Sequence, residues 1–568
     1  MNLTIPSSLF RASIRGFIFS LLFLCLDTLA SGQITGGNLS GSVMNNTNLF
    51  LRDSSIGADN TPQYDKQLIG SETWLNLTYN TNTVEAGMRF DLFQNSNLLD
   101  PQSSFSDAGI GRWYVKYHYN KLQVSGGYLY DQIGSGIIFR AYEDRTQLID
   151  NALYGVRAQY EMAPDWTIKA FSGKQKHLFD HYKTDIRGAN IEGFLNFDSL
   201  GGLSLAPGIG FVNTTYDNKT MNDVVDVLTS YRPDERVIPQ YNSYITSLYN
   251  NLSFGPLTWY AEWAHRSANV LYDPFAKRTL ISGDQIEGRI VKRAGDVLYS
   301  SLSYAIHGFG ISVDYKRTTN FEYRAHPLLP GNEGFIGFIP PMGRINTYRL
   351  TARYSPATQY IGEQAVQVDA RYKLNRRWSF NINASNITNQ NNDLLYRELY
   401  TEFTYKKRRK WQILGGVQFM DYNFAIYRGK PGYENVKSIV PYTEVLYKFS
   451  RSKSLRVEAQ YMFTRQDEGQ WAYTLFEVGL APHWLFEASL MYNVVSFAPK
   501  AQLNETLQHH LEEKGRVLYP TLGAVYTHGS NRFSLRYVKQ VAGVVCSGGI
   551  CRYEPAFSGV RFNLTSTF

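Results

Sequence analysis

The sequence predicts an all-β protein, a transmembrane antiparallel β-barrel of about 24 strands, within a range of about 20 to 28. Three observations predict it. Segments of alternating apolar and polar residues recur along the chain, short and long connections alternate between them, and the last ten residues repeat the alternation and end on Phe568. A strand with one apolar and one polar face suits a wall between lipid and a water-filled lumen.

The first residues have the features of a secretory signal peptide, which we assign to residues 1–32. Two arginines precede an uncharged apolar stretch at 16–26, and small residues suited to cleavage stand at 30–32. The mature protein would then be one barrel domain over 33–568. The apolar stretch is shorter than the roughly 18 to 20 residues that a spanning helix needs, and no later window approaches that length.

Composition fits one repeating architecture better than several soluble domains. No linker rich in Pro, Gly and Ser divides the 568 residues. The 41 Tyr and 33 Phe bring the aromatic fraction to 15%, yet the mean hydropathy is only −0.31, as expected where lipid-facing and lumen-facing residues alternate. The net charge of +8 is modest and no basic stripe carries interleaved aromatics, so we expect no nucleic-acid partner.

Strands of period two make up the predicted wall. In 83–93 the apolar residues fall on one face and the charged residues on the other, and the same alternation recurs at 112–119, 156–162, 366–372 and 455–463. Because the polar faces carry charges of both signs, we expect these charges to pair across neighbouring strands. A charged pore lining that filters solutes is the alternative. The charges assigned to the lumen are Glu85, Arg89, Asp91, Lys116, Arg157, Glu161, Arg456 and Glu458.

Short turns alternate with longer loops, and this alternation predicts the topology. In bacterial barrels the short turns face the periplasm and the long loops face the exterior. Trp166, Trp378, Trp411 and Trp484 each follow a short turn, so they would form one aromatic girdle at the inner interface. Both termini would be periplasmic. A soluble β-sandwich is the alternative interpretation of aromatics at strand starts.

A lumen of this width would be an open channel unless loops narrow it. We expect the loops at about 213–242, 267–296 and 319–363 to fold inward or to build an external cap. The first strand begins near Asn38. That start leaves no room for the N-terminal plug of a TonB-dependent receptor, so we do not expect that class.

The last strand predicted from the sequence, at 559–568, has one apolar face. Val560, Phe562, Leu564 and Phe568 share one face. The segment resembles the C-terminal insertion signal of bacterial outer-membrane β-barrels. The resemblance implies that Phe568 is the end of a signal that the barrel-assembly machinery reads.

Two further stretches carry a family resemblance. The first is the run IGSGIIFRAYEDR at 133–145, followed by 149–152 and 155–157, and the second is 348–359. Together they are similar to an outer-membrane barrel family of unknown function found in Bacteroidota, an uncharacterised porin-like barrel, over most of the mature chain. That family implies no activity. The glycine-rich run is no phosphate loop, because no Gly-Lys-Ser/Thr follows it.

We expect no catalytic site, no cofactor and no metal. No spacing of Ser, His and Asp selects a catalytic triad. Imidazole and carboxylate ligands at close spacing converge on a metal only where the chain is helical, so we interpret the two candidate groups as solvated loop residues. The basic turn at 406–410 is interpreted as a solvated hairpin, with an acidic periplasmic partner as the alternative. The candidate metal groups are His177, Asp180 and His181, and His509, His510, Glu512 and Glu513.

Two cysteines, Cys546 and Cys551, remain after removal of the signal peptide. An even pair in an exported protein is normally oxidised, so we predict a disulfide in the last external loop. Gly548 and Gly549 allow a tight reversal between them. Four residues separate the thiols, which does not fit a redox-active C-x-x-C centre.

The sequence thus indicates an integral outer-membrane protein of a Gram-negative bacterium, surrounded by outer-membrane lipid and lipopolysaccharide. Two functions compete: a porin-like pore or channel for small solutes, and a non-catalytic scaffold subunit of a larger secretion or assembly complex with other envelope proteins. A wide lumen and a charged wall favour the pore. Long, aromatic-rich external loops are typical of the scaffold.

Overall fold

The computed structural model describes residues 36–100, 102–145, 147, 149–495, 517–547 and 550–568. In these residues one antiparallel sheet of 25 strands closes on itself. β13 (Leu195–Phe197) continues β12 (Asp180–Gly193), and both pair with β14 (Leu203–Thr215). The wall therefore has 24 strands, and the predicted fold class is confirmed. The signal peptide assigned to 1–32 and the histidine group at 509–513 lie outside the described residues.

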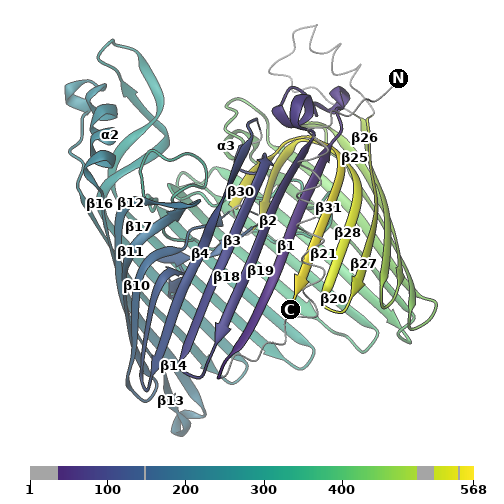
Figure 1. Cartoon of the computed structure of the whole chain (residues 1–568), viewed down its shortest axis with the longest axis horizontal. Helices are drawn as coiled ribbons and strands as arrows, with labels where there is room; N and C mark the ends of the chain where they lie inside the picture. Colours follow the sequence, from purple (N-terminus) through teal and green to yellow (C-terminus); the bar gives the residue numbers. More distant parts are fainter. Residues whose placement is uncertain (1–35, 101, 146, 148, 496–516, 548–549) are drawn as a thin grey trace.

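Each wall strand pairs with the next wall strand in the chain, and β31 closes the barrel on β1 (Figure 1). The wall strands besides β12 and β14 are β1 (Asn38–Phe50), β2 (Ile69–Asn80), β3 (Val84–Ser96), β4 (Phe105–Tyr119), β5 (Leu122–Leu129), β10 (Leu153–Ala163), β11 (Trp166–His177), β15 (Asn242–Phe254), β16 (Leu257–Thr279), β17 (Gln285–Ile306), β18 (Phe309–Thr319), β19 (Gly362–Tyr372), β20 (Trp378–Thr388), β21 (Leu394–Lys407), β22 (Trp411–Tyr422), β23 (Val436–Lys448), β24 (Lys453–Met462), β25 (Gln470–Leu480), β26 (Trp484–Val495), β27 (Leu518–His528), β28 (Asn531–Gln540) and β31 (Phe557–Thr567).

Short elements lie outside the wall. They are η2 (Ser54–Ile56), η3 (Gln63–Gln67), β6 (Asp131–Ile133), β7 (Phe139–Ala141), β8 (Glu143–Asp144), β9 (Ile149–Asp150), η4 (Asp198–Leu200), α2 (Asn218–Thr229), η5 (Pro233–Glu235), α3 (Phe424–Tyr427), β29 (Gly543–Ser547) and β30 (Ile550–Glu554). Among the described residues, no helix is long and apolar enough to cross a membrane.

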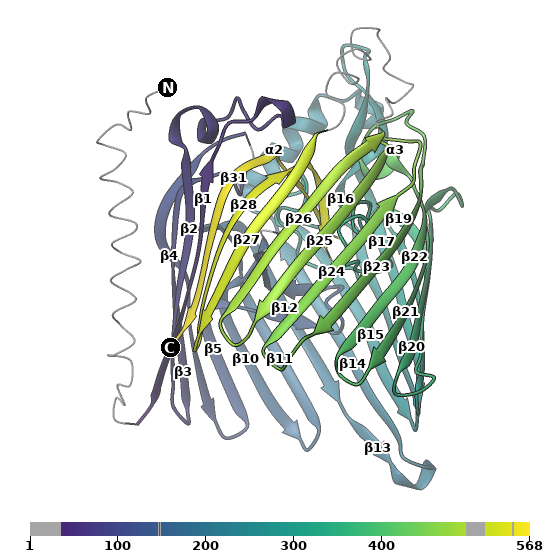
Figure 2. The same ribbon diagram turned by 90° about the vertical axis from the view of Figure 1, so that its right-hand side faces the viewer.

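Most of the long connections lie at one end of the barrel and most of the short turns at the other (Figure 2). Trp166, Trp378, Trp411 and Trp484 are the first residues of β11, β20, β22 and β26, so they share the short-turn end. The C-terminus reaches the same end. We refer below to the short-turn end and the long-loop end.

The two faces of the wall differ as the alternation predicts. In β3 the apolar Met88, Phe90 and Leu92 are 40 to 48% exposed, whereas Arg89 and Asp91 are 3 and 5% exposed. Exposed apolar and buried charged side chains are the reverse of a soluble protein. The outer face therefore suits lipid, and the inner face lines the lumen.

The loop expected at 213–242 spans 216–241 and contains the helix α2, which the sequence analysis did not predict. The Asp217 side chain caps the helix by accepting a hydrogen bond from the Lys219 amide at 3.0 Å. Met221, Val224 and Leu228 are buried on one face. Their spacing of three and four residues was the available helical signal.

The prediction of a loop at 267–296 was wrong, because most of this segment is strand. β16 and β17 continue as one long hairpin and turn only at 280–284. The register shifts between Arg266 and Asn269 and again between Asp273 and Lys277. Such irregularities break the period of two that reveals strands in a sequence. The hairpin extension and α2 pack together through Val224, Leu228 and Val270 at the long-loop end, and we call them the projection.

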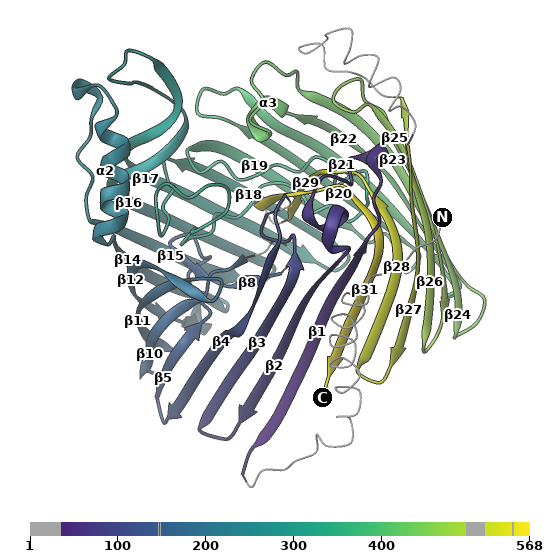
Figure 3. The same cartoon turned by 45° about the horizontal axis from the view of Figure 1, so that its top comes forward.

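Two segments fold into the lumen. The first inward segment, 130–152, joins β5 to β10, and the second inward segment, 320–361, joins β18 to β19. Figure 3 shows β8 of the first segment inside the ring of wall strands. The inward folding of 319–363 agrees with one of the two expected arrangements, whereas the first segment was not expected to fold inward.

Apolar packing holds both inward segments against the wall. Ile133, Ile137 and Ile138 are fully buried in a cluster with lumen-facing Val212 and Val297. The second inward segment continues to another part of the wall. There Leu350 and Tyr354 pack in a cluster with Tyr396, Met462 and Trp471. The second inward segment thus connects two separate regions of the wall across the lumen.

Candidate functional site

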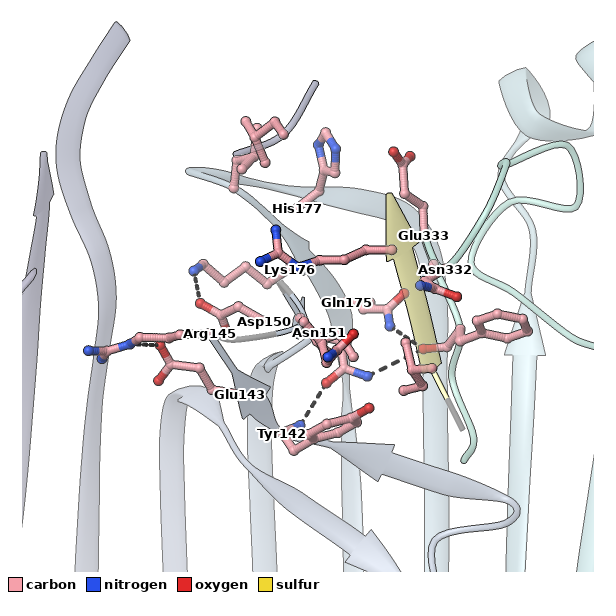
Figure 4. Close-up of a pocket in the computed structure, with 18 of the residues that line it drawn as sticks. Tyr142, Glu143, Arg145, Asp150, Asn151, Gln175, Lys176, His177, Asn332 and Glu333 are labelled. Atoms are coloured by element: carbon pink, nitrogen blue, oxygen red, sulfur yellow. Dashed lines mark hydrogen bonds and ion pairs between the residues drawn. The ribbon is translucent and has the colours of Figure 1, made fainter. Parts of the chain in front are cut away.

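A cavity of about 440 Å³ lies where the two inward segments meet the wall. It is lined mainly by β3, β11, both inward segments and the hairpin strand β30, with Trp74 of β2 and Tyr182 of β12 also contributing. Figure 4 shows polar side chains of β11 and of the two inward segments turned toward one another. The lining residues used below are Trp74, Arg89, Asp91, Tyr142, Glu143, Arg145, Asp150, Lys176, Asn332, Glu333, Phe335, Phe338 and Tyr360.

Arg89 is the centre of a buried ionic network on one side of this cavity. Its guanidinium donates from Nε to Asp91 Oδ1 at 2.6 Å, from Nη1 to Glu143 Oε1 at 2.9 Å and from Nη2 to Asp150 Oδ2 at 2.8 Å. Only 4% of the Arg89 side chain is exposed. Charge-assisted bonds of this length are strong where water is excluded. The network attaches the first inward segment to β3.

Asp150 has two further partners. Lys176 of β11 forms an ion pair with it, and the Tyr130 hydroxyl donates to Asp150 Oδ1 at 2.9 Å. Burial raises the pKa of the Asp150 carboxyl, but Lys176 and Arg89 outweigh burial, so the pKa lies below its ordinary value. Asp150 is therefore ionised at neutral pH, and it links β3, β11 and the first inward segment.

Aromatic faces form other parts of the lining. The Phe335 ring stacks on Tyr360 with centroids 4.4 Å apart, and the Arg145 guanidinium lies 5.1 Å from the Trp74 ring. Burial raises the pKa of Tyr142 to about 12, so its hydroxyl stays neutral and can donate a hydrogen bond. The cavity thus offers charges of both signs, neutral donors and flat apolar surfaces to one ligand.

The two inward segments bind each other through their backbones. The Phe338 amide donates to the Gly136 carbonyl and the Arg140 amide donates to the Ile336 carbonyl, both at 2.9 Å. A Cβ on Gly337 would lie 2.1 Å from the Ile137 carbonyl oxygen, so only glycine allows this approach. The stretches 133–145 and 348–359, which carried the family resemblance, both lie in the inward segments.

Glu262 of β16 holds the tip of the β6–β7 hairpin. Its carboxylate accepts from the Ser135 amide at 3.0 Å and from the Ser135 hydroxyl at 2.6 Å. The Tyr260 hydroxyl donates to the same carboxylate at 2.6 Å. Gly134 and Gly136 have φ angles of 55° and 98°, which the tight reversal requires. We call this contact the Glu262 clamp.

A second charged group lies on the lumen wall at β23 to β25. Arg456 contacts Glu444 at 3.1 Å, Glu458 at 2.7 Å and Glu477 at 3.3 Å. The Arg456 side chain is 29% exposed, so water reaches it. Three carboxylates around one guanidinium leave a local excess of negative charge on this part of the lumen.

The structure places the predicted lumen charges in three arrangements. Glu85 and Lys116 pair across β3 and β4 at 2.9 Å, and Arg456 pairs with both neighbouring strands. Arg89 and Arg157 differ from the expected cross-strand pairing, because they bind the first inward segment. Arg157 contacts Asp131 at 3.3 Å. Glu161 is exposed at the short-turn end of β10.

The predicted external loop around His177 is a tight turn between β11 and β12. His181 Nδ1 lies 3.3 Å from Asp180 Oδ1, and the His177 ring packs against Tyr182 with centroids 5.0 Å apart. In the described part of the chain, no three His, Cys, Asp or Glu side chains cluster as metal ligands.

Cys546 and Cys551 stand opposite each other in the backbone register of the β29–β30 hairpin. Opposite residues of an antiparallel pair have Cα atoms roughly 4.5 to 5.5 Å apart, which a disulfide can bridge. We predict that mass spectrometry of unreduced, alkylated protein finds neither cysteine modified. Alkylation of both cysteines in protein taken directly from the envelope would contradict the bridge. Because the loop is short, we expect reduction to lower stability only slightly.

Comparison with protein families identifies the chain. Residues 14–568 match a family of unknown function, DUF6029. The chain belongs to this family. No curated protein matches its sequence.

Solved structures similar to this DUF6029 chain include large barrels. A ferric enterobactin receptor mutant from Pseudomonas aeruginosa has 9% identity and a TM-score of 0.39, with 93% of this chain and 80% of that chain covered. OccAB4 from Acinetobacter baumannii has 11% identity and a TM-score of 0.34, with 79% and 99% covered. The copper transporter OprC has 9% identity and a TM-score of 0.37, with 94% and 80% covered.

Proposed function

We propose that the protein is an outer-membrane channel for small polar solutes, in which the two inward segments narrow the lumen and the cavity beside them binds the solute. One observation carries this proposal. The inward segments, the wall and β30 together enclose about 440 Å³ with converging charged and aromatic groups. Ligand sites of small molecules typically have this size and this mixture of apolar surface and a few polar groups.

The orientation that we propose follows the usual one of bacterial barrels. The short turns and both ends of the mature chain face the periplasm, and the projection faces the exterior. The apolar outer face supports contact with outer-membrane lipid and lipopolysaccharide. A signal peptide at 1–32 would direct export, and the barrel-assembly machinery would read Phe568. We propose no catalytic role and no cofactor.

The lining supports a solute that has both polar groups and one flat apolar face. Arg145 and Glu333 line the cavity with opposite charges, and the Asn332 amide adds a neutral partner. Phe335 and Phe338 offer ring faces. Sugars and aromatic zwitterions fit this combination, because each can stack on a ring and hydrogen bond at its edge.

The charge group at Arg456 provides the test of conduction. We expect the wild-type barrel to give stepwise conductance in planar bilayers, and we expect Arg456→Glu to increase cation preference severalfold, because four carboxylates would then meet in the lumen. Reversal potentials in a salt gradient measure the preference.

Lys410 provides the matched control for this measurement. It lies in the exposed turn between β21 and β22, outside the lumen wall strands, so Lys410→Glu makes the same charge change without changing the lumen. An unchanged reversal potential in Arg456→Glu would contradict conduction past this group.

The projection favours a second candidate function, a scaffold subunit of an envelope complex. Ile238, Phe275 and Ile281 are 81, 54 and 66% exposed in this region. Exposed apolar side chains on a part that extends beyond the wall are typical of partner contacts. A folded barrel that never conducts, together with the same partner recovered after mild-detergent purification, would support the scaffold over the channel.

A further inference from the structure

A second cavity lies on the lipid-facing side of the wall. It has a volume of about 640 Å³ and lies at the long-loop end of β21, β22, β23 and β24. It is separate from the cavity at Arg89, because the two share no lining residue. The residues that line it and carry the argument are Arg397, Leu399, Phe419, Asp421, Lys437, Ile439, Phe463 and Arg465.

Pro441 lies where the ladder between two of these strands is interrupted. The ladder between β23 and β24 ends at the pair Tyr442 and Gln460, and beyond it only the isolated bridge of Ile439 and Phe463 remains. Proline has no amide hydrogen, so it cannot donate to a neighbouring strand. The absent donor interrupts the ladder between β23 and β24 on one side of this cavity, which is a crevice in the outer surface.

The side of the crevice nearer the middle of the barrel is apolar. Leu399, Phe419, Ile439 and Phe463 come from four consecutive strands or their ends, and each is 41 to 48% exposed. They continue the lipid-facing surface of the barrel. Acyl chains of the surrounding lipid would contact this row.

The side nearer the long-loop end is charged. On each strand the charged residue lies two positions beyond the apolar one, on the same face. These charged residues are Arg397, Asp421, Lys437 and Arg465, and the strand register pairs Arg397 with Asp421 and Asp421 with Lys437. Because a strand rises roughly 3.3 Å per residue, this row lies about 7 Å above the apolar row. Three cations and one carboxylate give it a net positive charge.

The cations of this row are available to a ligand. Lys437 Nζ lies 3.8 Å from Asp421 Oδ2, and its side chain is 71% exposed. Arg397 Nε donates to the neutral Asn386 side chain at 2.9 Å, so that bond leaves the charge of Arg397 unbalanced. Arg465 is exposed. A phosphate can accept from several of these donors, and guanidinium groups bind it in pairs of hydrogen bonds.

We infer that this crevice binds one lipid of the outer leaflet, a glycolipid with a phosphorylated headgroup, with the phosphate on Arg397, Lys437 and Arg465 and an acyl chain on the apolar row. The inference rests on the proposed outer-membrane location but not on conduction. The crevice brings a cationic row and an apolar row together at one level of the wall, as a lipid with an anionic headgroup requires.

The test uses the full-length barrel in nanodiscs of phosphatidylcholine that contain either a phosphorylated bacterial glycolipid or the same lipid after removal of its phosphates. Native mass spectrometry counts the glycolipid that stays bound. We expect the phosphorylated form to be retained, and we expect Arg397→Gln/Lys437→Gln/Arg465→Gln to weaken its retention roughly a hundredfold, at about fivefold for each cation near a membrane surface.

A matched variant removes three cations from another part of the outer face. Lys174, Lys183 and Arg187 lie on β11 and β12 near the long-loop end and pair with Asp180 or Asp185. We expect Lys174→Gln/Lys183→Gln/Arg187→Gln to retain the glycolipid as the wild type does. Inorganic phosphate should not displace the lipid, because it has no acyl chain.

Three results would overturn the inference: equal retention by the crevice variant and the wild type, equal retention of the two lipid forms, or displacement by inorganic phosphate. Heat-modifiable migration on gels confirms in each case that the variant barrel has folded. Conductance of the same preparations is measured separately, so that failure of lipid binding and failure of the channel proposal give different results.

Discussion

Arg89→Gln is expected to release the first inward segment and to raise the single-channel conductance of the barrel. The substitution leaves Asp91, Glu143 and Asp150 without the guanidinium that all three contact. Glu143 and Asp150 keep Arg145 and Lys176, but the buried Asp91 loses the guanidinium that it pairs with. Removal of one partner from a buried ion pair costs about 3 to 5 kcal/mol. Planar-bilayer recordings measure the conductance, and thermal melting in detergent measures the loss of stability.

Arg371 is the control for this experiment. It lies on β19 and pairs with Asp369 at 2.9 Å, but its side chain is 73% exposed. An exposed pair contributes little to stability, so Arg371→Gln should leave both measurements close to those of the wild type. Equal conductance and equal melting in Arg89→Gln would show that the ionic network does not hold the segment.

Phe568→Asp is expected to reduce the yield of assembled barrel severalfold. β31 pairs with both β28 and β1, so the final strand closes the wall. At its end the Gly41 amide donates to the Phe568 carbonyl at 2.9 Å, and the Phe568 amide donates to the Gly41 carbonyl at 3.0 Å. A charged side chain on this lipid-facing position is costly. Heat-modifiable, protease-resistant protein in the envelope measures the yield.

Two further variants separate the role of the ring from that of the strand end. Thr567 lies on the polar face of β31 and is exposed, so Thr567→Asp should assemble normally. Phe568→Trp keeps an aromatic ring and should assemble as well. Wild-type yield of Phe568→Asp would count against an insertion signal.

The sequence predicts the wall well because period two is a local signal. The alternation of Met88, Arg89 and Phe90 is enough to assign each side chain to the lipid or the lumen face, and no distant contact changes that assignment. β16 and β17 were partly missed for the same reason. Their register shifts near Asn269 and Asp273 interrupt the period, and a local signal fails where the local geometry is irregular.

The inward segments depend on contacts that no local pattern shows. Ile137 meets Gly337 across 200 positions of the chain. The sequence did contain one indirect signal. The lumen-facing Val212 follows the lipid-facing Phe211, and the lumen-facing Val297 precedes the lipid-facing Leu298. A strand that is apolar on both faces must be covered on both, and those positions mark where the segments pack.

The cavity could be predicted only in part. Arg89 and Asp91 were assigned to the lumen from alternation alone, but Glu143 and Asp150 were not considered as their partners. Those partners reach Arg89 only because the first inward segment turns back on the wall. The site therefore combines residues with a strong local signal and residues whose positions depend on tertiary packing.

The strand β16 joins the projection directly to the lumen. One continuous strand carries the Glu262 clamp inside the lumen and then extends into the projection. A force that tilts the projection would also displace β16. The displacement would reach the hairpin tip at Ser135, which Glu262 of β16 holds. Because backbone hydrogen bonds join the two inward segments, a displacement of the first segment would also move the second. A displacement of the projection would thereby be transmitted along β16 to both inward segments.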